Sequence, residues 1–251
     1  MPLPAFKDNY IWTLRDAKRA AVVDPGDAAP VKAYLAKEQL ELVAILATHH
    51  HPDHTGGIAE LAAASRGIEV FGPRGEPIPA LTHPVSEGDR VAIPALSLSF
   101  SVLDIPGHTR AHVAYYGAGS LFCGDTLFAC GCGRVFEGTQ AQMLASLEKL
   151  AALPDETKVY CGHEYTLANI GFALTVDPGN AALAERQRRA RALREAGKPT
   201  LPSTLGEERA TNPFLRCAEP VVVESANKYL GARVADPVHV FAAIREWKNR
   251  A

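Results

Sequence analysis

The segment with the greatest capacity for chemistry is THHHPDHTGG at residues 48–57, which holds four of the chain's nine histidines. Imidazole and carboxylate groups are ligands of zinc and other first-row metals. In an extended segment, His49 and His51 project to the same side and can hold one ion together. A proline then turns the chain, so that Asp53 and His54 face another direction. The segment therefore predicts two adjacent metal positions served by one loop.

Three further candidate ligands each follow a glycine just beyond an expected strand: His108, Asp125 and His163. Ligands delivered from successive strand ends converge on one edge of a sheet, where open α/β proteins place their sites. A histidine-rich scavenging tract or a cloning remnant is usually terminal and lacks the intervening Pro-Asp that this segment has at residues 52–53. A single structural zinc takes only four ligands, so the whole set exceeds what such a site needs.

The elements that must position these residues are short apolar runs bounded by Gly, Pro and Asp. Strands are expected at residues 10–14, 20–23, 42–46, 96–103, 114–116, 120–123 and 158–161. Helical patterns lie between them at residues 28–38, 55–65 and 140–152. This alternation predicts an α/β architecture.

After Cys161 the strand signal fades. Helices are expected at residues 165–175, 181–196 and 238–248, and residues 198–220 are expected to form an irregular connector. We therefore expect a catalytic domain at residues 1–165 and a smaller, mostly helical domain at residues 166–251.

Composition limits the function classes. The 251 residues carry a formal net charge of -2, whereas a general nucleic-acid or membrane-surface binder needs a basic surplus. Residues 1–165 hold 13 basic and 19 acidic side chains, and residues 166–251 hold 13 basic and 9 acidic ones. A solvated basic helix and a basic lip for an anionic substrate both explain this asymmetry.

The cysteines and the N-terminal segment indicate a reducing compartment. Five cysteines are an odd number without the dense spacing of a disulfide scaffold, and Cys130-Gly-Cys132 lacks the CxxC spacing of a redox or metal pair. We expect buried, inert thiols. The start has no signal-peptide pattern, and no run reaches the roughly 18 apolar residues of a membrane span. A cytoplasmic protein is expected, with neither nucleic acid nor membrane as a partner.

The HxHxDH run, the Gly-His, the Gly-Asp-Thr and the later Gly-His-Glu-Tyr resemble the metallo-β-lactamase superfamily. Within it the chain is most similar to the glyoxalase II family, the hydroxyacylglutathione hydrolases. The segments that carry this resemblance are residues 6–12, 23–26, 124–128, 131–139, 161–166 and 212–216, with a weaker match at 235–238. The HxHxDH motif alone indicates only the superfamily. The Cys-Gly-Arg and His-Glu-Tyr segments narrow the resemblance to the glyoxalase II family, whose members are thioesterases.

The resemblance implies a four-layered αββα sandwich followed by the helical domain. It also implies two divalent metal ions, zinc in the first instance, with iron or manganese compatible. The implied ligands are His49, His51 and His108 for the first ion, Asp53, His54 and His163 for the second, and Asp125 as the bridge. His50 is not an expected ligand. Asp24 either orients a ligand imidazole or forms a turn before proline.

The implied reaction is hydrolysis of S-(2-hydroxyacyl)glutathione, chiefly S-D-lactoylglutathione, to glutathione and D-lactate, by a hydroxide that the two metals share. Asp53 and Asp125 are the implied catalytic residues, and Asp53 is the candidate acceptor of the hydroxide's proton. The implied glutathione-binding residues are Arg134, Phe136, Tyr165, Arg245 and Lys248. An exposed helix face is the alternative for Arg245 and Lys248.

Two positions depart from the family pattern. The family often has lysine where this chain has Arg134, which keeps the charge and adds donors. Many members have tyrosine where it has Phe136, which keeps the ring and loses a hydroxyl. Weaker substrate binding than in the tyrosine-bearing relatives is therefore expected.

Four other functions fit the sequence less well. A persulfide dioxygenase of the same superfamily uses one iron, and a complete second triad argues against it. A β-lactamase fits poorly with an intracellular setting and a basic lip. A nuclease would need a broader basic surface. A non-catalytic zinc module would close every coordination position with protein ligands. We expect a monomeric enzyme whose partner is the small-molecule thioester.

Overall fold

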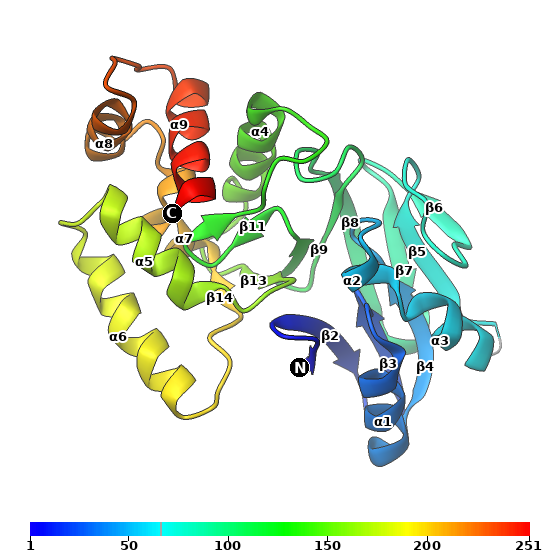
Figure 1. Ribbon diagram of the computed structural model, residues 1–251. Helices are drawn as coiled ribbons and strands as arrows, with labels where there is room; N and C mark the ends of the chain where they lie inside the picture. Colours follow the sequence, from blue (N-terminus) through cyan, green and yellow to red (C-terminus); the bar gives the residue numbers. More distant parts are fainter. Residues whose placement is uncertain (66) are drawn as a thin grey trace.

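The computed structural model describes residues 1–65 and 67–251, and two six-stranded sheets form its centre (Figure 1). The strands of the first sheet are, in spatial order, β1 (Pro2–Ala5), β2 (Asn9–Arg15), β3 (Arg19–Val23), β4 (Glu41–Leu46), β5 (Glu69–Pro73) and β6 (His83–Val85). Those of the second are β14 (Ser203–Thr204), β13 (Lys158–Cys161), β10 (Ser120–Gly124), β9 (Val113–Gly117), β8 (Leu98–Asp104) and β7 (Arg90–Ile93). A small third sheet pairs β11 (Leu127–Phe128) with β12 (Gly131–Cys132).

The layers follow from the two-residue period of the strands. In β2, Trp12 packs in the core shared with the second sheet, whereas Ile11 packs in a separate core on the opposite face. Helices α1 (Ala28–Glu38) and α3 (Ile58–Ala64) cover that opposite face. Helix α4 (Gln140–Ala151) covers the outer side of the second sheet through its buried apolar side chains. The expected αββα sandwich is confirmed.

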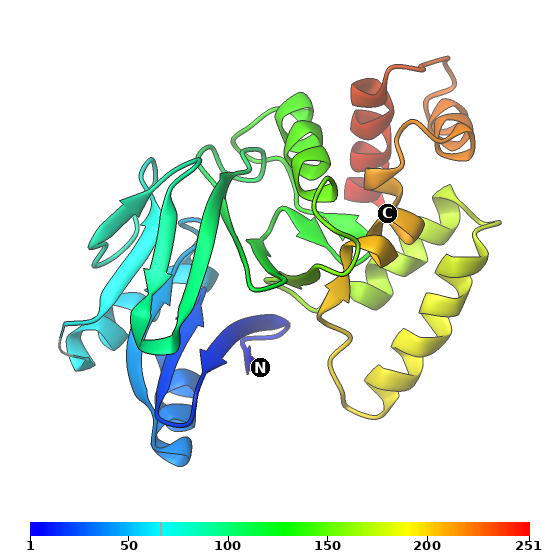
Figure 2. The same cartoon turned by 180° about the vertical axis from the view of Figure 1, so that it is seen from behind.

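The remaining helices follow β13 and gather at the side of the second sheet that faces away from the first (Figures 1 and 2). They are α5 (Thr166–Val176), α6 (Ala181–Glu195), α7 (Leu205–Thr211), α8 (Pro220–Leu230) and α9 (Pro237–Arg250). Phe172, Phe214 and Phe241 belong to the same buried cluster as Phe122 of the second sheet. The two parts of the chain thus share one core. Among the described helices, none is both long enough and apolar enough to span a membrane.

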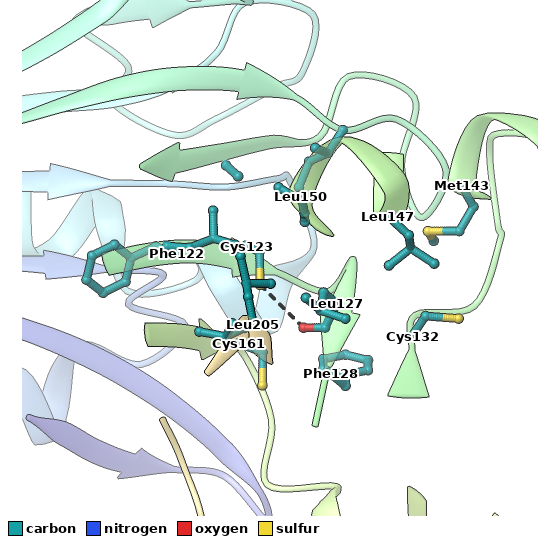
Figure 3. Close-up of a cluster of buried hydrophobic side chains, with 14 of the residues drawn as sticks. Phe122, Cys123, Leu127, Phe128, Cys132, Met143, Leu147, Leu150, Cys161 and Leu205 are labelled. Carbon is teal, nitrogen blue, oxygen red and sulfur yellow. Dashed lines mark hydrogen bonds between the residues drawn. The ribbon is translucent and has the colours of Figure 1, made fainter. Parts of the chain in front are cut away.

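Figure 3 shows the centre of this shared core. Phe122, Cys123 and Cys161 come from the second sheet, Met143, Leu147 and Leu150 from α4, and Leu205 from α7. The thiol of Cys123 donates a hydrogen bond of 3.3 Å to the Leu127 carbonyl. Leu205 enters this core because β14, just before it, pairs with β13 of the second sheet.

Most of the expected elements are present, and three expectations were wrong. The connector at 198–220 contains β14, α7 and the 3₁₀ turn Pro213–Leu215, and the segment after it forms α8. The single helix expected at 55–65 is two helices, α2 (Pro52–Thr55) and α3. The backbone between them passes so close to another loop that a Cβ on Gly57 would lie 2.5 Å from the Ala28 nitrogen. The strand expected at 96–103 begins at Leu98, after a 3₁₀ turn at Pro94–Leu96.

Candidate active site

The candidate ligands meet at the carboxyl-terminal ends of four strands from both sheets. The histidine-rich loop follows β4, His108 follows β8, Asp125 follows β10 and His163 follows β13. Glycines precede three of these ligands because neighbouring atoms leave no room for a side chain. A Cβ on Gly162 would lie 2.6 Å from Asp125 Oδ1. Gly124 has a φ of +47°, a backbone conformation that favours glycine.

The first group of candidate ligands is His49, His51 and His108. Nδ1 of His51 lies 3.2 Å from His49 Nε2 and 3.0 Å from His108 Nε2. Two nitrogens bound to one tetrahedral zinc ion are about 3.3 Å apart, given Zn–N bonds of about 2.0–2.1 Å. Burial, followed by the neighbouring histidines His54 and His112, lowers the pKa of His49 well below its usual range. Burial also lowers the pKa of His51 and of His108, so these rings favour the neutral form that binds metals.

The second group is Asp53, His54 and His163. The Nε2 atoms of His54 and His163 are 3.3 Å apart, and each lies 3.5 Å from Asp53 Oδ2. Each of the two groups offers three ligand atoms that lie within 4.8 Å of one another. The spacing again suits one ion held by three protein ligands, with a coordination position left for water.

Asp125 lies between the two groups. Its Oδ2 is 3.5 Å from His108 Nε2 and 3.3 Å from His163 Nε2, while its Oδ1 is 3.3 Å from His54 Nε2. This Oδ1 is buried and makes no hydrogen bond within the described part of the chain. His54 already faces Asp24 through Nδ1, so its Nε2 can satisfy Asp125 only by carrying a second proton. A divalent cation at this point would satisfy both atoms, so the donor set fits a metal.

The charges around His54 lead to the same conclusion. Burial acts to lower the pKa of His54, but the carboxylates of Asp125 and Asp24 outweigh it and raise that pKa well above its usual range. This part of the site therefore favours positive charge. Together with the fold, the His and Asp groups imply a divalent metal centre.

The candidate ligands are held by outer partners, as is usual in metal sites. Asp24 Oδ2 lies 3.1 Å from His54 Nδ1, so the structure places Asp24 against a candidate ligand. The backbone carbonyl of Arg134 lies 2.8 Å from His108 Nδ1. Thr48 Oγ1 lies 3.0 Å from His49 Nδ1.

Asp8 and Asn9 are among the outer partners that sequence reasoning missed. Asp8 Oδ1 lies 2.8 Å from His163 Nδ1, and Asn9 Nδ2 donates a hydrogen bond of 3.0 Å to Asp53 Oδ2. Both residues belong to the segment at 6–12 that carries the family resemblance, which was the available signal. Nothing in their spacing indicates that they lie beside residues 53 and 163.

A pocket of about 360 Å³ opens beside this centre, and His108 and Asp125 line it. All five residues expected to bind glutathione line the same pocket: Arg134, Phe136, Tyr165, Arg245 and Lys248. Tyr165 stacks on His163 with ring centroids 4.7 Å apart. The structure thus brings together every site residue that the sequence indicated.

Arg245 and Lys248 are not on an exposed helix face. Arg245 is only 3% exposed, and its Nη1 donates a hydrogen bond of 2.8 Å to the Cys132 carbonyl. Lys248 is half-buried and donates a hydrogen bond to Asn169. Burial, followed by the charge of Arg245, lowers the pKa of the Lys248 amine to about 8. The pocket therefore concentrates positive charge from α9 next to the candidate metal centre.

The five cysteines are free and buried, as expected. Cys130 and Cys132 belong to different buried clusters, and neither belongs to the groups of candidate metal ligands.

Comparison with known proteins agrees with this fold and site. Residues 6–163, more than half of the chain, match the model of the metallo-β-lactamase superfamily, and the chain belongs to that superfamily. Residues 164–251 match the model described as the hydroxyacylglutathione hydrolase C-terminus. The chain is a hydrolase of the hydroxyacylglutathione hydrolase (glyoxalase II) family.

Curated relatives match over nearly the whole length. The chain is 57% identical to the hydroxyacylglutathione hydrolase of Nitrosomonas eutropha, over 99% of this chain and 97% of that protein. It is 55% identical to the hydroxyacylglutathione hydrolase of Methylobacillus flagellatus, over 99% of this chain and 98% of that protein. The family resemblance found in the sequence is confirmed.

Solved structures show the same fold at lower identity. The B3 metallo-β-lactamase BLEG-1 is 27% identical, with a TM-score of 0.62 over 85% of this chain and 97% of that one. ETHE1 from Myxococcus xanthus is 25% identical, with a TM-score of 0.62 over 96% of this chain and 93% of that one. A third structure, at 27% identity and a TM-score of 0.62, covers 86% of this chain and 100% of that one, and is described as di-iron-bound.

Proposed function

We propose that this protein hydrolyses S-(2-hydroxyacyl)glutathione, chiefly S-D-lactoylglutathione, to glutathione and D-lactate, the second step of methylglyoxal detoxification. The observation that carries the proposal is one pocket lined both by candidate metal ligands and by the basic side chains Arg134, Arg245 and Lys248. The curated relatives carry the name of this activity.

The proposed metal ligands are His49, His51 and His108 for one ion, Asp53, His54 and His163 for the other, and Asp125 for both. A pair of divalent ions supplies an activated water at neutral pH and stabilises negative charge that develops on the carbonyl oxygen. Zinc is the first candidate, and iron and manganese suit the same donors.

Glutathione carries two carboxylates and one ammonium, so the thioester is an anion. Lys248 and Arg134 offer charge-assisted hydrogen bonds to its carboxylates. The buried Arg245 adds positive charge at the base of the pocket, and its Nε has no hydrogen-bond partner among the described residues. The rings of Tyr165 and Phe136 flank the pocket, where they can pack against the peptide backbone of the ligand.

Asp53 is the proposed acceptor of the proton released when water attacks the thioester. Its side chain is 42% exposed, so the proton can pass on to solvent. The leaving thiol has a pKa near 8.5, so it departs as a thiolate without a general acid. We propose a monomeric, cytoplasmic enzyme in which residues 1–165 carry the metals and residues 166–251 supply most of the charge for the substrate.

The test is release of thiol from S-D-lactoylglutathione by the purified protein, with and without a chelator. We expect turnover that the chelator abolishes and added zinc restores. No turnover by the metal-loaded protein overturns the proposal. Oxygen uptake with glutathione persulfide, by protein with one iron per chain, would instead identify the persulfide dioxygenase reaction.

A further inference from the structure

Three side chains near the metal-ligand loop have no part in the proposed chemistry and line a pocket separate from the one described above: His50, Glu76 and Glu137. We propose that they act together as positioning residues, here called the His50 clasp. The clasp holds the loop at residues 133–139 against the metal-ligand loop, so that Arg134 and Phe136 stand beside the first metal position. This inference rests on the proposed function and adds a determinant of substrate affinity to it.

Glu76 forms the buried side of the clasp. Its side chain is 3% exposed, and its Oε2 lies 3.0 Å from His50 Nδ1. Its Oε1 accepts a hydrogen bond from the hydroxyl of Thr109 and another, of 3.1 Å, from the backbone N–H of Ala111. One carboxylate therefore joins the loop that carries His49 and His51 to the loop that carries His108.

Glu137 forms the outer side. Its Oε1 lies 3.3 Å from His50 Nε2, and its Oε2 accepts a hydrogen bond of 3.0 Å from the backbone N–H of Arg110. The two nitrogens of one imidazole thus contact two carboxylates from separate loops. His50, which is adjacent to two candidate ligands, faces this pair of carboxylates.

The loop that the clasp holds carries the exposed ring of Phe136. That ring is 61% exposed, and its centroid lies 5.3 Å from the ring of His108 and 5.9 Å from that of His51. The backbone N–H of Phe136 donates a hydrogen bond of 3.3 Å to the His108 carbonyl. Because so exposed a ring receives little packing support, its loop is held by its neighbours, and Glu137 adds side-chain contacts to the backbone hydrogen bonds of Phe136 and Gly138.

The energetic role is pre-organisation. A loop that is already ordered loses less conformational entropy when the substrate binds. Releasing Glu137 should therefore weaken substrate binding while the metal ligands stay in place. A rise in KM without a change in metal content distinguishes this positioning role from a general loss of structure.

The experiment compares Glu137→Ala with Glu137→Gln, whose amide oxygen can still accept from the backbone N–H of Arg110 and whose NH2 group can donate to an unprotonated Nε2 of His50. For Glu137→Ala we expect KM for S-D-lactoylglutathione to rise roughly 2- to 12-fold, the equivalent of one lost hydrogen bond, with kcat and metal content unchanged. Glu137→Gln should restore a KM close to that of the native protein. Glu87→Ala is the matched control, because Glu87 likewise accepts a backbone hydrogen bond, but its partners are Asp104 and Lys149, which lie outside the clasp and the loop at residues 133–139.

A double-mutant cycle tests the contact itself. If His50 and Glu137 act through one another, the KM of His50→Ala/Glu137→Ala will not exceed that of the worse single variant. Additive effects, an unchanged KM in Glu137→Ala, or a failed rescue by Gln overturn the clasp. Loss of metal from Glu137→Ala also overturns it, because Glu137 would then be part of a metal site.

A readout without turnover separates this inference from the proposed function. Binding of glutathione itself to the metal-loaded protein, measured by calorimetry, should weaken in Glu137→Ala by the same factor as KM. Absence of turnover by the native protein overturns the proposed function. Equal glutathione affinity in the native protein and in Glu137→Ala overturns the clasp.

Discussion

The carboxylate oxygen Oδ1 of Asp8 lies 2.8 Å from Nδ1 of His163, although 155 residues separate the two in the chain. The turn before β2 thereby orients a candidate ligand that follows β13. Asn9, the first residue of β2, donates a hydrogen bond to Asp53, so the turn and the start of the strand support two of the three residues of the second group. The carboxylate of Asp8 also raises the basicity of the His163 imidazole, which makes it a stronger ligand for a metal ion.

Replacing Asp8 should weaken metal binding at the second position. We expect Asp8→Ala to lower the affinity for one of two metal equivalents by roughly 10- to 100-fold, the usual cost of losing such a partner. Titration with a competing chelator, followed by elemental analysis, measures this. Asp16→Ala is the control, because Asp16 accepts backbone hydrogen bonds in a turn and contacts no candidate ligand. Two equivalents bound with native affinity would contradict the assignment.

Replacing Asp53 tests its two proposed roles together. Asp53→Asn keeps the shape but removes the charge and the ability to accept a proton. We expect a lower metal content at the second position and a fall in kcat of at least the roughly 100-fold that is typical of a lost general base. If metal content and rate are both native, Asp53 has neither role.

Adding one hydroxyl to the ring of Phe136 should strengthen substrate binding. If the ring contacts the bound substrate, Phe136→Tyr gains up to one hydrogen bond, and KM should fall roughly 2- to 12-fold while kcat stays constant. Phe6→Tyr serves as the control, because Phe6 is similarly exposed, at 62%, and does not line the pocket. An unchanged KM in Phe136→Tyr would exclude a contact that the hydroxyl can improve.

The pKa of Lys248, lowered to about 8, predicts a pH-dependent KM. Below pH 8 the amine is charged and attracts the anionic thioester. As pH rises through about 8 the amine loses its proton, so KM should rise. Lys248→Arg should abolish this rise, because a guanidinium stays charged throughout the range. A rise that persists in Lys248→Arg would assign the titration to another group.

The five thiols should be unreactive in the folded protein. Burial raises the pKa of Cys130 and of Cys161 to about 12, so the reactive thiolate is scarce at neutral pH. We expect no rapid reaction with a thiol reagent in native buffer and five equivalents in denaturant. Rapid native labelling, with loss of activity, would show that a thiol is accessible from the pocket.

The strands and helices that sequence patterns predicted best are those that are amphipathic or buried over several residues. Helix α1 has the expected bounds, Ala28–Glu38. The side chain of its N-cap residue, Asp27, accepts a hydrogen bond from the backbone N–H of Ala29, as aspartate commonly does at the start of a helix. Helix α8 was missed, although Pro220 stands at its start and Gly231 at its end. Strand β14 was missed because a strand of two residues is too short to show the alternation of apolar and polar side chains. Only its pairing with β13 identifies it as a strand.

The candidate ligands themselves could be found from the chain alone, because their residue types and their positions after strand ends are local properties. Among the residues that support them, Asp24 was named in advance as one of two alternatives, whereas Asp8 and Glu76 were not found. Asp8 lies beside His163, and Glu76 beside His50, only because the packed sheets bring distant loops within hydrogen-bond range. Such contacts require the two atoms to lie within about 0.3 Å of an ordinary hydrogen-bond distance. No spacing along the chain encodes those distances, and packing alone sets them.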